Sequence, residues 1–351
     1  FASPSENGTV ARPGHSVTLT INAGLQDIAE RALGDAVTKM GAEGGDIVIL
    51  DPQSGEIRAM ASRRADRQAT AATALTEPYE PGSTLKPFVV AALLQRGRAR
   101  VDEVVHTFGG TWIYNGRAIE DDHKASSFTL ADVIRFSSNI GIVQFAQRLT
   151  PREHYEVLRD AGFGAPTGTT YPSESPGRLA PPKSWTRQSP ASLAMGYEIM
   201  VTPLQLATAY AAIANGGELL QPALIKEIRS ADGALQFRHE RRVVRRLMRP
   251  DVARTMRRLL KSVVDGGTAE GSSLATFAVA GKTGTAKVAR NGHYVKGAYK
   301  ASFVGMFPAD APQIVILVKL DNPSKSVSGG KAAAPVSKAV LEAAIAARDA
   351  A

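Results

Sequence analysis

The feature that most constrains the fold of this chain is that its strand-like segments lie near its two ends. Residues 46–50 and 56–61, joined by the turn sequence Asp51-Pro52-Gln53-Ser54-Gly55, predict a β-hairpin. Three further strand-like segments lie at 278–288, 301–308 and 314–320. Because the region between the two groups has mostly helical patterns, one sheet must unite the two ends of the chain. We therefore predict an α+β fold with a five-stranded antiparallel sheet.

Helical patterns flank the sheet segments and fill the middle of the chain. Asn22 offers an N-cap to a helix that reaches about Met40, and Gly41 follows as a stop. A closing helix rich in alanine is expected at about 333–348. Further helices are expected at 129–148, 151–161 and 203–215, and residues 98–128 are expected to be irregular. We expect the first and last helices to cover one face of the sheet and the helical middle to cover the other.

The chain is predicted to form one domain, at 17–351, preceded by a short N-terminal remnant or linker at 1–16. Within the domain we expect a sheet subdomain at about 17–65 and 275–351. A mostly helical subdomain is expected at about 66–274. Residues 17–21 alternate apolar and polar side chains, which predicts a half-buried strand at the start of the sheet subdomain.

Composition excludes several classes of protein. Hydrophobic residues make up 44% and charged residues 21% of the chain, as in ordinary globular proteins. No apolar run approaches the roughly 18 residues that span a bilayer, and the N-terminus lacks a signal-peptide pattern. The absence of cysteine excludes disulfides, thiolate zinc sites and a cysteine nucleophile.

The formal net charge of +9 comes largely from a run of arginines between residues 238 and 261. We expect a solvated loop there, leading into a helix that buries Val252, Met256, Leu259, Leu260 and Val263. The run has no interleaved aromatic residues and no nucleic-acid-binding motif, so we predict no nucleic-acid partner.

The segment Glu80-Pro81-Gly82-Ser83-Thr84-Leu85-Lys86 places a serine and a lysine three residues apart where a loop becomes a helix. At this spacing Ser83 and Lys86 lie side by side on one helix face. The unpaired N–H groups of a helix N-terminus favour an anionic oxygen that develops in a transition state. The pattern therefore indicates a nucleophile and a base delivered together.

Two more motifs follow in the chain. Ser137-Ser138-Asn139 comes after an amphipathic helical pattern, and Lys282-Thr283-Gly284-Thr285 comes after a short apolar stretch. The order S-x-x-K, S-x-N, K-T-G is that of penicillin-binding proteins and class A β-lactamases. With this order the chain resembles the transpeptidase domain of class B, monofunctional penicillin-binding proteins, over nearly its whole length from Val17 to Val336. Specific to that class are Glu80-Pro81-Gly82-Ser83, the segment from Met195-Gly196-Tyr197 to Thr202-Pro203-Leu204-Gln205, and Ala301-Ser302-Phe303-Val304-Gly305.

The resemblance implies the penicillin-binding and serine β-lactamase-like transpeptidase fold and the activity of a peptidoglycan D,D-transpeptidase. Ser83 would attack a peptidoglycan stem peptide ending in D-Ala-D-Ala, and the amine of a second stem would resolve the acyl-enzyme. β-Lactam antibiotics would acylate the same serine. Neither a metal nor an organic cofactor is implied.

A serine hydroxyl needs a base, and no Ser-His-Asp set is evident, so Lys86 in its neutral form is the expected base. Burial and the like charge of Lys282 should lower its pKa. By resemblance, Ser137 would bridge Lys86 and Lys282 and pass a proton to the leaving amine, and Asn139 would hold a substrate amide. An alternative for serine and asparagine at these positions, Ser138 above all, is helix N-capping.

By the same resemblance, Lys282, Thr283 and Thr285 would lie on an edge strand and bind the terminal carboxylate of the peptide, which would pair as an added strand. Gly284 would let the substrate approach closely. The oxyanion hole would combine the backbone N–H groups of Ser83 and Thr285.

Other functions stay open on the sequence. A D,D-carboxypeptidase uses the same three motifs with water as acceptor. A β-lactamase is disfavoured because no Glu-x-x-Leu-Asn or Tyr-Gly-Asn pattern is present. A sensor or scaffold protein of the cell-wall machinery is the non-enzymatic alternative. Glu120-Asp121-Asp122-His123 is interpreted as a polar turn, not a metal site.

The family resemblance also predicts where the protein acts and with what. We expect the periplasmic, extracytoplasmic face of the bacterial cytoplasmic membrane. A membrane-embedded glycosyltransferase of the SEDS type (shape, elongation, division and sporulation) is the expected partner. Class B proteins usually have a transmembrane anchor and an elongated pedestal, which we expect to be absent from this chain because residues 1–16 are too few to hold them.

Overall fold

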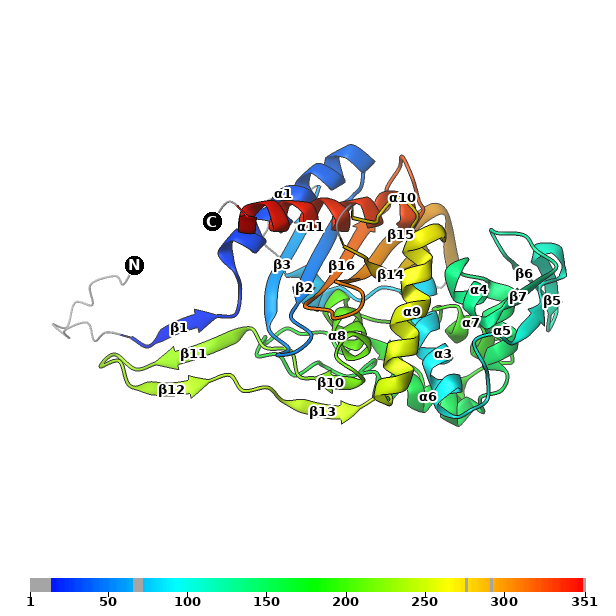
Figure 1. Cartoon of the computed structure of the whole chain (residues 1–351), viewed down its shortest axis with the longest axis horizontal. Coiled ribbons are helices and arrows are strands. Elements are labelled where there is room, and N and C mark those ends of the chain that lie inside the picture. Colours follow the sequence, from blue (N-terminus) through cyan, green and yellow to red (C-terminus); the bar gives the residue numbers. More distant parts are fainter. Residues whose placement is uncertain (1–13, 66–71, 275–276, 291–292, 350–351) are drawn as a thin grey trace.

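A five-stranded antiparallel sheet forms the centre of the molecule (Figure 1). The structure is a computed structural model that describes residues 14–65, 72–274, 277–290 and 293–349. Most of the expected 1–16 remnant lies outside these residues. In spatial order the strands are β14 (Ala280–Arg290), β15 (His293–Phe307), β16 (Ile314–Asp321), β2 (Gly44–Leu50) and β3 (Ile57–Arg64). Both ends of the chain thus supply the sheet, and the predicted fold class is confirmed.

Helices cover both faces of the sheet. Helices α1 (Ala23–Met40) and α11 (Ala334–Asp349) lie together on one face, and α8 (Pro203–Ala214) packs on the other (Figure 1). Every residue of α8 is buried, because this helix has the sheet on one side and the other helices on the other. Strand β2, covered on both faces, is buried throughout.

Local signals explain the ends of helix α1. The Asn22 side chain accepts a hydrogen bond from the backbone N–H of Leu25 at 2.9 Å, as an N-cap does. Gly41 takes the left-handed conformation with φ of 59°, which ends the helix at little steric cost. The predicted helix start and stop are confirmed.

The helices beside the sheet form the mostly helical part of the molecule. They are α3 (Lys86–Gln95), α4 (Leu130–Arg135), α5 (Asn139–Ala146), α6 (Pro151–Asp160), α7 (Ser189–Ala194) and α9 (Pro250–Gly266). Helix α9 buries the five apolar residues expected of it. The single helix predicted at 129–148 is wrong, because the chain breaks between α4 and α5 at Phe136–Ser138.

Short elements complete the chain. They are the helices α2 (Thr73–Thr76) and α10 (Gly329–Ala332) and the strands β1 (Ser16–Leu19), β4 (Val104–His106), β5 (Thr111–Tyr114), β6 (Arg117–Glu120), β7 (Ser127–Thr129), β8 (Arg178–Leu179), β9 (Ile199–Met200), β10 (Glu218–Leu220), β11 (Ile225–Arg229), β12 (Leu235–Arg238) and β13 (Val243–Arg246). Strands β4 to β7 form two small paired units within the stretch that was expected to be irregular.

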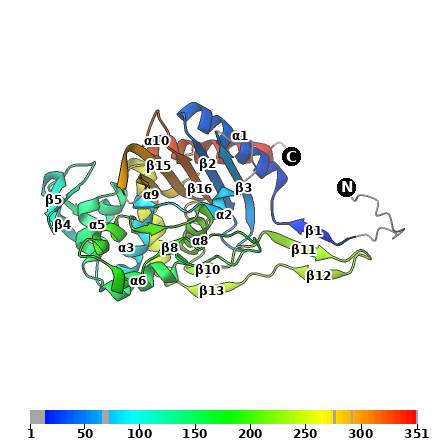
Figure 2. The ribbon, with the colours of Figure 1, turned by 180° about the vertical axis from the view of Figure 1, so that it is seen from behind.

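Strand β1 differs from its prediction. It pairs with β11, which pairs with β12, and this small three-stranded sheet extends away from the body of the molecule (Figure 2). All four β1 residues are exposed, so the predicted strand is present but its half-burial is wrong. Within residues 17–21, burial begins only after the strand, where Thr20 is buried and Ile21 packs against the core. The division into a sheet and a helical subdomain stays our proposal, with the central sheet drawn from 44–64 and 280–321.

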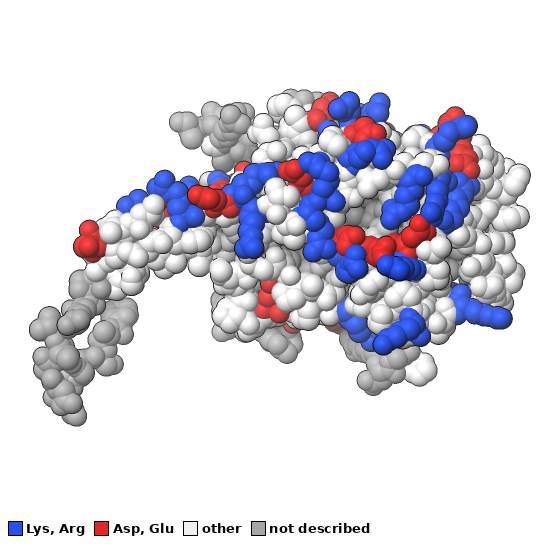
Figure 3. All heavy atoms as spheres, turned by 90° about the horizontal axis from the view of Figure 1, so that it is seen from below, with Lys and Arg blue, Asp and Glu red and all other residues white. Residues whose placement is uncertain are grey.

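The arginine-rich stretch is also more regular than predicted. Strands β12 and β13 occupy part of the expected loop, and Lys and Arg side chains follow them along the molecule (Figure 3). Several of these arginines pair with carboxylates: Glu218 binds Arg241 and Arg246, and Glu227 binds Arg229 and Arg238. The positive charge is therefore solvated and partly compensated at the surface.

Candidate active site

Ser83 lies in a short 3₁₀ turn, Gly82–Leu85, that leads directly into α3. The backbone N–H of Gly82 donates to the carbonyl of Gly196 at 3.0 Å. The Tyr210 hydroxyl donates to the carbonyl of Thr84 at 2.7 Å. Ser83 itself is half-buried. Gly196 and Tyr210 thus hold the backbone of the turn, and the Ser83 side chain keeps access to solvent.

Lys86 is fully buried at the start of α3. Its ammonium donates to the Ser137 carbonyl at 2.5 Å, to Asn139 Oδ1 at 2.8 Å and to Ser137 Oγ at 3.3 Å. These hydrogen bonds join two of the three motifs. Among the described residues, the hydrogen bonds of the Lys86 ammonium go to Ser137 and Asn139, and only the backbone N–H of Lys86 donates to Ser83, at its carbonyl.

Burial lowers the pKa of Lys86 to about 7, because water no longer stabilises the ammonium, and the charges of Asp121 and Asp122 oppose this effect. The expected lowering is thus present. The expected influence of the Lys282 charge is found on the other lysine: burial, with the Lys86 charge second, lowers the pKa of Lys282 well below its ordinary value.

Lys282 lies on β14, which is an edge strand as predicted, and its side chain also contacts Ser137. It is fully buried, and its ammonium donates to Ser137 Oγ at 2.9 Å and to the carbonyl of Thr283 at 3.2 Å. Ser137 Oγ therefore accepts from both lysines. Since a hydroxyl has two acceptor lone pairs and one hydrogen, the Ser137 O–H remains free to donate elsewhere.

Ser137 occupies an unusual backbone position between α4 and α5. Its φ is 61°, in the left-handed region where glycine is the usual residue. The N–H of Ser137 donates to the Ile134 carbonyl and the N–H of Ser138 to the Val133 carbonyl, which is the Schellman pattern at the end of α4. Ser138 then caps α5, accepting from the Gly141 N–H at 2.8 Å. The capping alternative is therefore correct for Ser138.

Residues of the K-T-G motif on β14 contact several neighbouring segments of the chain. Thr283 Oγ1 lies 2.7 Å from Thr268 Oγ1, and Thr285 Oγ1 accepts from the Gly329 N–H at 3.1 Å. A Cβ on Gly284 would lie 2.4 Å from Ser302 Oγ and 2.8 Å from the Pro81 carbonyl. Glycine at 284 therefore lets the Ser83 turn approach β14, which is a reason that the sequence did not suggest.

The remaining contact between motifs is backbone packing. A Cβ on Gly82 would lie 3.4 Å from the carbonyl oxygen of Thr285, so the Ser83 turn lies against the strand that carries Thr285. The predicted site residues from all three motifs are thus brought into one region. Ser83, Ser137, Asn139 and Thr285 are half-buried there, whereas both lysines are fully buried.

Sequence reasoning missed Asp121. This carboxylate is 5% exposed and accepts hydrogen bonds from the Ser138 hydroxyl and from the N–H groups of Asn139 and Ile140. Its segment follows directly on β6, which ends at Glu120. No local spacing connects Asp121 to the S-x-N motif, so the sequence carried no signal for the contact.

A polar row across the sheet was also missed. Lys319 is buried, its ammonium lies 2.8 Å from Asp46 Oδ2 and 3.1 Å from Asp321 Oδ1, and the Tyr79 ring lies 5.3 Å from it. Cross-strand pairing connects Lys319 to the K-T-G strand through a row formed by Gly284, Ser302, Lys319, Asp46 and Ser62. The row lies beneath the segment that leads from Tyr79 to Ser83.

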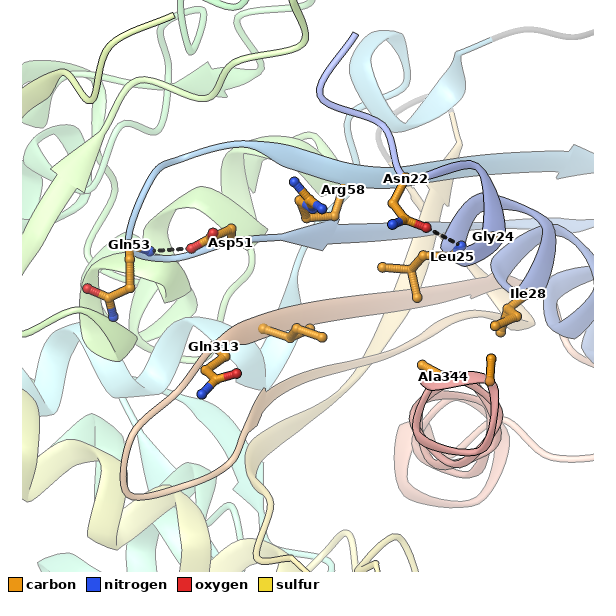
Figure 4. Close-up of a pocket in the computed structure, with 11 residues that line it drawn as sticks. Asn22, Gly24, Leu25, Ile28, Asp51, Gln53, Arg58, Gln313 and Ala344 are labelled. Carbon is orange, nitrogen blue, oxygen red and sulfur yellow. Dashed lines mark hydrogen bonds between the residues drawn. The ribbon is translucent and has the colours of Figure 1, made fainter. Parts of the chain in front are cut away.

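One cavity of the molecule lies apart from these residues. It has a volume of about 640 Å³ and lies between the start of α1, the end of α11 and the β2–β3 turn (Figure 4). Its lining includes Arg58, Asn22 and Leu25, and none of the motif residues. The candidate active site is marked instead by the hydrogen-bonded lysines and serine.

Comparison with known proteins identifies the family. The family model described as the penicillin binding protein transpeptidase domain matches residues 45–342. The chain belongs to this family, as the three motifs and the fold indicated. Among curated relatives, the "Probable peptidoglycan D,D-transpeptidase PbpC" of Pseudomonas aeruginosa is 36% identical over 330 residues, covering 91% of this chain and 56% of that protein. The chain thus spans about half the length of most of the curated relatives it matches.

Solved structures agree with this assignment. The transpeptidase domain of penicillin-binding protein 3 from Burkholderia pseudomallei superposes with a TM-score of 0.84 at 33% identity, covering 94% of this chain and 96% of that one. Penicillin-binding protein 3 from Mycobacterium tuberculosis, solved in complex with ampicillin, gives 0.89 at 30% identity, covering 97% and 81%. Within the described residues, no helix is long and apolar enough to cross a membrane.

Proposed function

We propose that this chain is the catalytic domain of a peptidoglycan D,D-transpeptidase that acts through an acyl-enzyme on Ser83. The observation that carries the proposal is that Ser137 Oγ accepts hydrogen bonds from two fully buried lysines next to the turn that bears Ser83. Two buried cations that share one hydroxyl favour loss of a proton. The relatives named as D,D-transpeptidases support the same reading.

In the proposed acylation, neutral Lys86 takes the hydroxyl proton as Ser83 Oγ attacks the carbonyl carbon of the penultimate D-alanine. The backbone N–H groups of Ser83 and Thr285 stabilise the oxyanion. When the peptide bond breaks, the Ser137 hydroxyl donates a proton to the leaving amine and is resupplied from Lys86. The products of this step are free D-alanine and an ester on Ser83.

Deacylation reverses the proton path. The amine of a second stem peptide attacks the ester carbonyl and gives its proton to Lys86, and Ser83 Oγ leaves as it regains a proton. The result is a peptide cross-link. Lys282, Thr283 and Thr285 bind the substrate carboxylate along β14, and Asn139 binds a substrate amide once its contact with Lys86 loosens. No metal or cofactor enters these steps.

β-Lactams are the second class of ligand that we propose. A β-lactam carries a strained amide and a carboxylate, so it presents to Ser83 and β14 the groups that a D-Ala-D-Ala end presents. The ampicillin and aztreonam complexes of the Mycobacterium tuberculosis relative support this proposal.

We also propose where the protein works. Its substrate lies outside the cytoplasm, so the domain acts at the periplasmic, extracytoplasmic face of the membrane. A membrane-embedded glycosyltransferase of the SEDS type is the proposed partner. Support for this partner comes from the class B resemblance alone.

The test is covalent labelling with a fluorescent penicillin, followed by intact mass for several hours. We expect one stable drug adduct on the wild-type chain and none on Ser83→Ala. Ser184→Ala, an exposed serine on a distant turn, is the matched control and should label normally. Rapid loss of the adduct with accumulating hydrolysed drug would indicate a β-lactamase, and no adduct on folded protein would favour a scaffold.

A second assay separates cross-linking from hydrolysis. The chain is given a stem peptide ending in D-Ala-D-Ala together with an acceptor amine, and products are read by mass spectrometry. A transpeptidase yields the amide with the acceptor, and a D,D-carboxypeptidase yields only the shortened peptide and free D-alanine. Release of D-alanine without the amide at saturating acceptor would overturn the transpeptidase proposal.

A further inference from the structure

The Ser137-Ser138-Asn139 turn carries the groups that contact both lysines, yet its backbone is strained. Ser137 has a φ of 61°, and a left-handed residue other than glycine costs about 1–2 kcal/mol. Such a conformation persists only where the surrounding structure holds it. The Schellman hydrogen bonds to Ile134 and Val133 hold the turn on its α4 side, and contacts on its α5 side complete the support.

Asp121 makes the contacts that hold this turn. Its Oδ2 accepts from the Ser138 hydroxyl at 2.6 Å, and its Oδ1 accepts from the N–H of Asn139 at 2.5 Å and of Ile140 at 3.0 Å. These N–H groups are the first two of α5, which no residue of the helix itself can satisfy. A buried carboxylate at a helix N-terminus also interacts favourably with the helix dipole.

Neighbours of Asp121 complete the support from the same segment. The ring of His123 stacks on Phe136, with centroids 4.2 Å apart, and Phe136 immediately precedes Ser137. The Asn139 side-chain amide donates to the carbonyl of Glu120 at 2.9 Å, so its Oδ1 is turned toward Lys86. The segment 120–123 thus contacts the turn on both sides of Ser137.

We infer that Asp121 is a positioning residue for acylation, holding the strained Ser137–Asn139 turn so that Ser137 and Asn139 meet the two lysines. The inference rests on the proposed function. Asp121 makes no hydrogen bond to either lysine among the described residues, so it acts through Ser138 and the start of α5. Loss of its carboxylate lets the turn relax toward ordinary backbone angles, which moves the Ser137 hydroxyl away from Lys86 and Lys282.

The charges around Lys86 provide a matched control. Asp121 and Asp122 are the carboxylates whose charges act on Lys86, and Lys282 is the cation that faces it from β14. Asp122 is exposed, and none of its hydrogen bonds among the described residues reaches the turn. Asp121→Asn and Asp122→Asn therefore remove the same charge, but only the first also replaces an oxygen that accepts a hydrogen bond from the turn with an amide NH2 group.

The experiment measures the second-order rate constant of β-lactam acylation against pH for the wild-type chain, Asp121→Asn, Asp122→Asn and Ser138→Ala. Losing hydrogen bonds to a charged group predicts a plateau rate about tenfold to a hundredfold lower for Asp121→Asn. Its pH profile should also move to lower pH, because a carboxylate near Lys86 is gone. Asp122→Asn should move the profile in the same direction and keep the plateau. Ser138→Ala should lower the plateau and keep the profile.

Equal plateau rates for Asp121→Asn and Asp122→Asn would overturn the inference. If Asp121→Asn fails to fold by circular dichroism, Ser138→Ala decides, and a wild-type plateau for that variant would count against positioning. A crystal structure of either variant gives a readout that needs no activity: a Ser137 φ still near its present value contradicts the inference. Failure of the wild-type chain to acylate would instead contradict the proposed function.

Discussion

At the residue scale, the main feature of the site is that burial lowers the pKa of Lys86 and of Lys282. An exposed lysine is protonated at neutral pH and cannot accept a proton. In this fold Lys86 and Lys282 are both fully buried, and both have a lowered pKa, mainly because of desolvation. Ser137 offers each of them an acceptor oxygen, which compensates part of the cost of burial. The property that suits these two lysines to the proposed chemistry is therefore their burial, which lowers their pKa.

The lowered pKa of Lys86 predicts a pH dependence. Neutral Lys86 is the proposed base, and with its pKa lowered to about 7 the neutral fraction rises with pH until that value is passed. The acylation rate constant should therefore increase about tenfold per pH unit well below the pKa and level off above it. Stopped-flow acylation with a chromogenic cephalosporin checks this, with drug hydrolysis in buffer as control. A rate constant that is flat across the acid range would contradict a neutral Lys86 base.

At the element scale, the turn that bears Ser83 is positioned by close backbone packing. Gly196 has a φ of 86°, and a Cβ at this position would lie 1.9 Å from the carbonyl oxygen of Gly82. Gly284 approaches the same turn from β14. Two glycines from distant segments thus let the turn fit between them, and this explains part of the family-like Met195-Gly196-Tyr197 pattern.

Gly196→Ala should therefore displace the Ser83 turn. A misplacement of about 1 Å can reduce the rate of a positioned reaction about a hundredfold, so we expect acylation to fall by that order. Gly97→Ala is the matched control, since Gly97 also has a positive φ, of 64°, but open space around its Cβ position. The control should lose only about 1–2 kcal/mol of stability from backbone strain. Thermal unfolding and penicillin labelling together test this, and normal labelling of Gly196→Ala would refute the packing argument.

At the scale of the whole molecule, the small sheet of β1, β11 and β12 stands apart from the core. Val17, Ile228 and Phe237 are cross-strand neighbours on it, and Val17 and Phe237 are 54% and 46% exposed. Both outer strands are sheet edges. Exposed apolar side chains next to unpaired strand edges promote association between molecules.

We expect this chain to self-associate through the projecting sheet at high concentration. Phe237→Ser should reduce the association seen by sedimentation velocity and leave penicillin labelling unchanged, because the sheet lies far from Ser83 in the fold. Ile113→Ser, which removes an even more exposed apolar side chain on β5, is the control and should leave association as it is. Equal effects of the two substitutions would show that the sheet is not the contact.

Much of the fold follows from local signals. The five central strands, the capped start and glycine stop of α1, and the buried face of α9 were all predicted, because periodicity and capping depend on residues a few positions apart. The errors arose where a partner distant in the chain decides the outcome. Strand β1 alternates like a half-buried strand, but its partner β11 lies outside the core, and β12 and β13 are strands only because β11 and β10 pair with them.

The sequence by itself determined which residues are candidates for the proposed chemistry, since the three motifs and their order indicate a serine nucleophile, two lysines and a bridging serine. Only the tertiary structure decided the state of those residues. Burial that lowers the pKa of Lys86 and Lys282, the left-handed backbone of Ser137, and the contact of Asp121 with the start of α5 all depend on atoms brought together from distant segments. Desolvation and backbone strain are properties of the packed chain, so no local pattern of residues encodes them.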